Sequence, residues 1–140
     1  MIYLDTSAAI PLFIAEQASD QIDAWLLSYD GALVSSDWIV TEFASALSIK
    51  QRTGHLSAKN ASAAWRGFQS FCESGLRLSP VTRVAFSLAA KYARDSTSKL
   101  RSGDALHLAM AVVLGATQMA TLDTTLANNA KRLKIATVSF

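Results

Sequence analysis

The chain has 140 residues, of which 51% are hydrophobic and 17% are charged, with 13 Lys and Arg against 11 Asp and Glu. This length fits a single domain over residues 1–140, and the apolar content supplies a sizeable core. There is no uninterrupted apolar run long enough to span a bilayer, and no basic and then apolar leader, so we expect a cytoplasmic protein without membrane contact. The single Cys72 excludes an intrachain disulfide and a thiolate zinc cluster, and we expect it to be buried and inert.

Short apolar segments alternate with helical patterns along the chain. We expect strands at Ile2–Leu4, Ala32–Ser35, Leu76–Ser79, Gln118–Leu122 and Ala136–Phe140. Helical periodicity predicts helices at about Ser7–Ala15, Ser19–Ser28, Trp38–Thr53, Ser57–Cys72, Thr82–Arg94, Asp104–Leu114 and Thr124–Leu133. Pro11 should make the first helix short or irregular. This order predicts a three-layer α/β/α domain with a mainly parallel sheet of about five strands.

Two acidic residues directly follow predicted strands. Asp5 closes the run Ile2–Leu4, and Asp123 follows the run that ends at Leu122. In an open parallel sheet the carboxyl ends of the strands line the crevice where ligands bind, so these two carboxylates are expected to share one site. Each of them also fits an ordinary strand-end or helix-capping role.

Two further acids lie on apolar helical patterns. Glu42 is three or four residues from Trp38, Ile39 and Ala46, which places it on or beside a hydrophobic face. Asp104 opens a segment that is hydrophobic on all sides and should form a buried helix, with its carboxylate at the positive end.

The four acids become informative as a set, although each has a structural alternative. Asp104 also fits a helix cap, and Glu42 also fits a pair with a buried Arg. Four inward-facing carboxylates without obvious cationic partners repel one another, and a divalent cation resolves that repulsion. Carboxylate oxygens favour Mg²⁺ or Mn²⁺, whereas zinc would call for His or Cys ligands.

Four segments around these acids resemble the acidic motifs of PIN-domain ribonucleases, and more narrowly those of VapC toxins. They are Ile2–Ala8, Trp38–Phe43, Arg101–Ala109 and Ala120–Asp123. The resemblance covers essentially the whole chain in the family's order. It implies a Mg²⁺- or Mn²⁺-dependent endoribonuclease with an RNA substrate. It also implies a cognate VapB-type antitoxin, a homodimer and a toxin-antitoxin hetero-oligomer.

Metal-assisted hydrolysis of an RNA phosphodiester gives each acid a role. We expect Asp5 and Asp104 to hold the main ion, and Asp123 and Glu42 to hold a second ion or to orient the attacking water. No protein nucleophile is required.

Hydroxyl side chains beside the acids fit a supporting role. Thr6, Ser7 and Thr121 are placed to donate hydrogen bonds to the ligating carboxylates, although Ser7 also fits a helix cap and Thr121 a strand residue. His107 lies one helical turn after Asp104 and invites a role as base or ligand. We expect it instead to be a hydrogen-bonded histidine in a buried helix.

Basic residues precede Asp104 in a cluster. Arg94, Lys99 and Arg101, with Lys91, are predicted to bind RNA phosphates beside the scissile bond, as are Lys50 and Arg52 at the end of the Glu42 helix. A solvated surface is the alternative for each of them.

The alternatives for the whole chain are a stand-alone PIN-domain nuclease in RNA processing and a non-catalytic PIN-like interaction module. A phosphotransferase with Asp5 as nucleophile is disfavoured, because Ser7 stands where such sites commonly have a second acid.

Overall fold

The computed structural model describes all 140 residues, and its strands form one sheet in which every neighbouring pair is parallel. The strands are β1 (Ile2–Leu4), β2 (Leu33–Ser36), β3 (Arg77–Ser79), β4 (Gln118–Ala120) and β5 (Ala136–Thr137). Their order across the sheet is β3-β2-β1-β4-β5. The chain moves outward from β1 through β2 and β3, and later fills the other side with β4 and β5. The strand order therefore reverses between β1 and β4, where open α/β sheets bind ligands.

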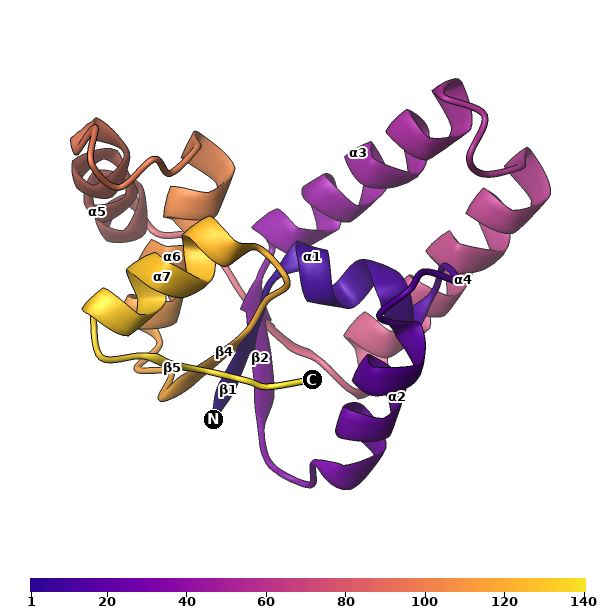
Figure 1. Cartoon of the computed structure of the whole chain (residues 1–140), viewed down its shortest axis with the longest axis horizontal. Helices are drawn as coiled ribbons and strands as arrows, with labels where there is room; N and C mark the ends of the chain where they lie inside the picture. Colours follow the sequence, from indigo (N-terminus) through magenta and orange to yellow (C-terminus); the bar gives the residue numbers. More distant parts are fainter.

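Helices cover both faces of the sheet and produce the three layers predicted from the sequence (Figure 1). One layer holds α1 (Thr6–Ala9), the 3-10 helix η1 (Ile10–Leu12), α2 (Ser19–Ser28), α3 (Trp38–Arg52) and α4 (Ala58–Ser74). The other layer holds α5 (Arg83–Arg94), α6 (Ser102–Val113) and α7 (Thr124–Arg132). In Figure 1, α3 and α4 form a hairpin that projects away from the sheet.

The alternation of side chains along β1 divides the core between the two layers. Ile2 and Leu4 pack with residues of α1 to α4, whereas Tyr3 packs with residues of α5, α6 and α7. Successive strand residues point to opposite faces, so this division follows directly from the pleat. The hydroxyl of Tyr3 consequently lies on the α6 side of the sheet.

Aromatic packing fixes α3 against α4. The rings of Phe43 and Phe68 are stacked with centroids 4.0 Å apart, and both side chains are fully buried. Phe13 meets both rings edge-on. Gly54, in the turn between the helices, has φ +76°, a conformation that glycine adopts without strain. The predicted hairpin is confirmed, and so is the capping of α4 by Ser57, whose side chain accepts a hydrogen bond from the Asn60 N–H.

Several predicted boundaries are wrong. The first helix ends far short of Ala15, because α1 stops at Ala9 and continues only as the 3-10 turn that contains Pro11. The last two strands are shorter than predicted: β4 stops at Ala120, before the turn that leads to Asp123, and β5 stops at Thr137. The expected burial of Cys72 is also only partly correct, because its side chain is half-buried. Burial and the neighbouring Glu73 still raise the pKa of its thiol.

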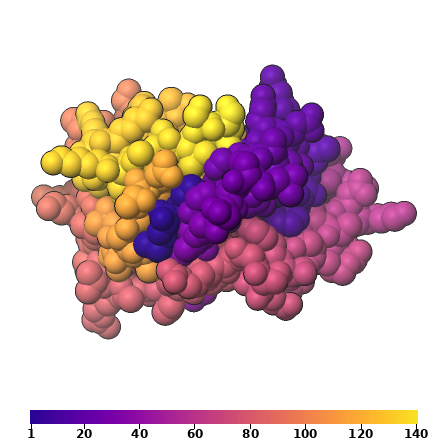
Figure 2. Space-filling view, turned by 90° about the horizontal axis from the view of Figure 1, so that it is seen from below, coloured from indigo at the N-terminus to yellow at the C-terminus, as the bar shows by residue number.

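The amino ends of the strands lie opposite the predicted site. Figure 2 views this side, where the start of the chain (indigo) lies between the orange and yellow C-terminal third and the purple segment that contains α2 and β2. The carboxyl ends of the strands face the other way, toward the start of α3 and α6 (Figure 1). None of the helices combines the length and the apolar character needed to cross a membrane.

Candidate active site

Asp5 occupies the end of the central strand and is almost completely buried. Its backbone N–H donates to the carbonyl of Ala120, which ties it to β4. Its side chain caps α1, and Oδ2 accepts hydrogen bonds from the Ser7 N–H, from Ser7 Oγ at 2.5 Å and from Thr121 Oγ1 at 2.8 Å. Oδ1 lies 3.5 Å from Nε2 of His107. Three hydrogen bonds to one oxygen fix the orientation of this carboxylate.

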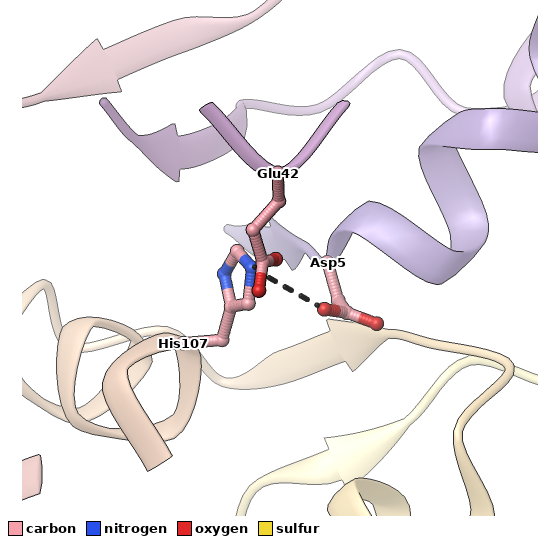
Figure 3. A group of neighbouring side chains, drawn as sticks. All are labelled: Asp5, Glu42 and His107. Atoms are coloured by element: carbon pink, nitrogen blue, oxygen red, sulfur yellow. Dashed lines mark hydrogen bonds and ion pairs between the residues drawn. The ribbon is translucent and has the colours of Figure 1, made fainter. Parts of the chain in front are cut away.

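Glu42 reaches the same point from α3, in the helical layer that also contains α1. It lies on the second turn of α3, and its Oε2 is 2.5 Å from Nε2 of His107 and accepts a hydrogen bond of 2.6 Å from Thr6 Oγ1. Figure 3 shows Glu42, His107 and Asp5 converging from α3, α6 and the end of β1. The partner of Glu42 is therefore a histidine and not the buried Arg that the sequence left open.

The pKa of Glu42 reflects these contacts. Burial acts to raise it, but the hydrogen bond and the charge of His107 outweigh burial and hold it below its ordinary value, with help from Thr6 and Trp38. The Trp38 indole N–H is buried near Glu42 and makes no hydrogen bond of good geometry. Glu42 is consequently ionised at neutral pH.

His107 is fully buried and hydrogen-bonded through both ring nitrogens, as predicted. Nδ1 is 2.9 Å from the hydroxyl of Tyr3, which in turn lies 3.1 Å from Oγ of Ser36. Burial would lower the pKa of His107, but Tyr3, the hydrogen bond to Glu42 and the nearby carboxylates raise it to about 10. The sequence did not indicate that Nε2 of His107 would lie next to two of the candidate acids, Glu42 and Asp5. The one available signal was its position one turn after Asp104.

Asp104 and Asp123 border this group. Asp104 lies in the first turn of α6 and is half-buried. Burial raises the pKa of Asp104, and the negative charges of Asp123, Asp5 and Glu42 raise it further. Asp123 caps α7, with Oδ1 accepting a 2.7 Å hydrogen bond from the Leu126 N–H. The capping interpretation is therefore correct for Asp5 and Asp123, but it does not remove either carboxylate from the cluster.

The donor set fits a divalent cation. Ligand atoms of Asp5, Glu42 and His107 lie within 4.8 Å of one another, while Asp104 lies outside this tight group and feels the negative charges of Asp5, Glu42 and Asp123. Both nitrogens of His107 are already engaged, so carboxylate oxygens are the better ligands, and these suit Mg²⁺ or Mn²⁺. Four carboxylates face a single imidazolium, which leaves an excess of negative charge for a cation to balance.

The three hydroxyl residues all contact the acids or their supports. Thr6 donates to Glu42, while Ser7 and Thr121 donate to Asp5. Ser7 Oγ also accepts from the N–H of Leu122, and Thr121 Oγ1 accepts from the N–H of Asp123. These two hydroxyls thereby join α1 to the turn after β4. Ser7 lies inside α1, so the cap role considered for it belongs to Asp5.

The basic residues before Asp104 are exposed and free of salt bridges. Arg94 ends α5, Lys99 lies in the connection to α6, and Arg101 is the residue that precedes α6. Lys50 differs, because it forms a 2.5 Å salt bridge with Glu16. The predicted phosphate contact of Lys50 thus competes with an existing partner.

Comparisons with known proteins find one matching family model and several similar folds. A model of the PIN domain matches residues 2–132. The fold is similar to VapC20 of Mycobacterium tuberculosis, described as a Sarcin-Ricin loop cleaving toxin, with a TM-score of 0.74 and 19% identity over 92% of this chain and 95% of that one. FitAcB from Neisseria gonorrhoeae gives a TM-score of 0.69 and 19% identity, covering 99% of this chain and 97% of that one. PAE2754 from Pyrobaculum aerophilum gives 0.69 and 20%, covering 98% and 90%. A comparison with curated proteins by sequence finds no match.

Proposed function

Because the chain belongs to the PIN-domain family, we propose that it is a metal-dependent endoribonuclease and the toxin of a VapBC-type toxin-antitoxin pair. The observation that carries this proposal is the gathering of Asp5, Glu42, Asp104 and Asp123 where the strand order of the sheet reverses. The raised pKa of Asp104 supports it, because burial and, after it, the negative charges of Asp123, Asp5 and Glu42 all disfavour the ionised carboxyl in the absence of a balancing cation. Structural ion pairs alone would leave no such excess.

In this proposal Asp5 and Asp104 would hold the main Mg²⁺ or Mn²⁺ ion, and Asp123 and Glu42 would hold a second ion or orient the attacking water. A bound ion lowers the pKa of water and neutralises charge on the phosphate under attack. The protein's own contribution is to fix the carboxylates. Ser7 and Thr121 hold Oδ2 of Asp5 and leave Oδ1 directed at the cluster, while Thr6 holds Glu42.

The substrate we propose is RNA. VapC20, which shares the fold, is described as cleaving the Sarcin-Ricin loop. In this chain Arg94, Lys99 and Arg101 supply unpaired positive charge close in sequence to Asp104, and such charge attracts a phosphate backbone. An RNA-processing nuclease and a non-catalytic interaction module remain the competing functions that the experiments below separate.

Partner surfaces support the toxin role. FitAB, another protein of this fold, was solved bound to a DNA fragment. In this chain a mostly apolar hollow of about 500 Å³ lies between η1 and the start of α4, lined among others by Leu12, Ile14 and Leu56. An amphipathic antitoxin segment fits such a groove. On α5, Val84 and Phe86 are 69% and 56% exposed, an apolar pair that a second copy of the chain would cover.

The catalytic proposal is tested by incubating RNA with the protein in Mg²⁺, in Mn²⁺ and in chelator. We expect cleavage only with metal. Asp5→Asn and Asp104→Asn should abolish cleavage while the proteins stay folded, whereas Asp23→Asn, an exposed acid on α2, should cut like the wild type. Full activity in Asp5→Asn or Asp104→Asn would refute the site, and metal-independent cleavage would refute the mechanism.

The toxin role is tested by co-expressing the chain with the protein encoded immediately upstream. Co-purification through a tag on one partner, together with loss of ribonuclease activity, is the expected result. An active protein that ignores this neighbour would instead indicate a stand-alone RNA-processing enzyme.

A further inference from the structure

His107 is a buried side chain that the proposed hydrolysis does not use. It lies one turn after Asp104 on α6, yet its ring reaches across the end of the sheet to Glu42 on α3, in the other layer. Both ring nitrogens are committed, Nδ1 to the Tyr3 hydroxyl at 2.9 Å and Nε2 to Glu42 Oε2 at 2.5 Å. The ring therefore connects a strand, two helices and both helical layers at the position of the acid cluster (Figure 3).

We propose that His107 is a positioning residue that holds the Glu42 carboxylate beside Asp5 in the orientation that metal binding and hydrolysis require. This inference rests on the proposed nuclease function. His107 is not proposed to touch RNA or to ligate the ion, since neither nitrogen is free to do so.

Glu42 needs such support because little else holds it in place. Its side chain is long and 25% exposed, and apart from His107 it accepts a hydrogen bond from Thr6 Oγ1. Asp5 and Asp104 carry like charges nearby, which push the Glu42 carboxylate toward solvent. A donor inside the protein at 2.5 Å opposes that displacement.

The ring of His107 is itself firmly fixed. The Tyr3 and His107 rings pack edge to face with centroids 5.7 Å apart, and the Tyr3 hydroxyl is anchored by Ser36 Oγ. Tyr3, Ser36 and His107 are all fully buried. The position of Glu42 is therefore set by the sheet through Ser36, Tyr3 and His107.

Two substitutions distinguish the hydrogen bond made by Nε2 of His107 from the one made by Nδ1. The amide of His107→Gln can reach the place of Nε2 and still donate to Glu42, whereas the amide of His107→Asn reaches only the place of Nδ1. We expect His107→Asn to lower kcat for RNA cleavage about 10- to 100-fold with KM within about twofold, and to weaken Mn²⁺ binding in calorimetry. His107→Gln should restore most of both. Tyr3→Phe keeps the core volume and should shift kcat in the same direction as His107→Asn, so the test stands even where the asparagine variant is poorly folded.

A cycle with Glu42→Ala decides whether His107 acts through Glu42. If it does, His107→Asn changes neither the Mn²⁺ dissociation constant nor the single-turnover rate once Glu42 is absent. Three results would each overturn the inference. They are equal effects of His107→Asn in both backgrounds, no recovery of activity and Mn²⁺ binding in His107→Gln, and a Glu42→Ala variant that binds Mn²⁺ and cuts RNA like the wild type. A wild type that binds Mn²⁺ but cuts no RNA would refute the nuclease proposal and leave this cycle readable through Mn²⁺ binding.

Discussion

Gly103 provides a test of the site geometry, because its missing side chain leaves space for Glu42. Gly103 lies in the first turn of α6, immediately before Asp104. A methyl group at this residue would collide with Oε1 of Glu42 and come to 3.4 Å from Nε1 of Trp38. The backbone of Gly103 does not have a positive φ, so alanine can adopt it. Gly103→Ala therefore changes the space available to the Glu42 carboxylate and little else.

Two effects of opposite sign determine the stability of Gly103→Ala. Alanine in place of glycine stabilises a helix by about 0.5–1 kcal/mol. Displacing the carboxylate breaks the contacts of Glu42 with His107 and Thr6, and a hydrogen bond to a charged group contributes about 1.5–3 kcal/mol. The lower end applies, because the Glu42 side chain is 25% exposed and regains water. Two such bonds at about 1.5 kcal/mol each, less the helix gain of about 0.5–1 kcal/mol, give a net destabilisation of about 2–2.5 kcal/mol, which lowers Tm by roughly 6–10 °C for a chain of this size.

The assay is thermal and urea unfolding in chelator, in the wild-type and Glu42→Ala backgrounds. Without the Glu42 carboxylate the collision disappears, so Gly103→Ala should there stabilise the protein by about 0.5–1 kcal/mol. The sign of the effect thus reverses between the backgrounds, and single-turnover RNA cleavage should fall in Gly103→Ala alone. Destabilisation of the same size in both backgrounds would refute the placement of Glu42 against α6.

Three further outcomes follow from the described contacts. Ser7→Ala removes a donor to Asp5 and should weaken Mn²⁺ binding about tenfold in calorimetry; Ser74→Ala, whose hydroxyl bonds only a carbonyl of its own helix, is the matched control, and equal affinities would contradict the support of Asp5. The raised pKa of Asp104 means that the folded protein binds this proton more tightly than the unfolded chain, so metal-free stability falls as pH rises from the unfolded pKa of about 4 to the folded value. Asp104→Asn should lose this pH-dependent part of the free energy of unfolding, measured by urea unfolding at a series of pH values. Parallel curves of stability against pH for the variant and the wild type would contradict this prediction. The last prediction concerns the three basic residues before Asp104, which are Arg94, Lys99 and Arg101. Replacing all three by Gln should reduce the salt dependence of RNA binding by roughly one unit of slope per lost phosphate contact. An unchanged slope would show that they are only a solvated surface.

Local sequence patterns were sufficient for the elements and for the position of the acids along them. A three-residue apolar run before Asp5 and a continuous apolar segment after Asp104 define a buried strand and a buried helix, whatever surrounds them. The alternation of such elements predicts a parallel sheet, and parallel strands bring their carboxyl ends to one edge. Where packing competes with pattern, the predicted boundaries were wrong, as in β4, which gives way to the Asp123 turn. The first helix is short, as Pro11 indicated, and α1 ends at Ala9.

Only the tertiary structure decided which side chains meet. Tyr3 and His107 are separated by 104 residues, and Glu42 and His107 by 65. No period or spacing in the sequence encodes those pairs. They depend on which face of β1 carries Tyr3, on α6 packing against that face, and on α3 arriving from the other layer. A buried histidine is read from the sequence as part of the core because burial is a local average, whereas its role depends on the few atoms that packing places within hydrogen-bonding distance of its ring.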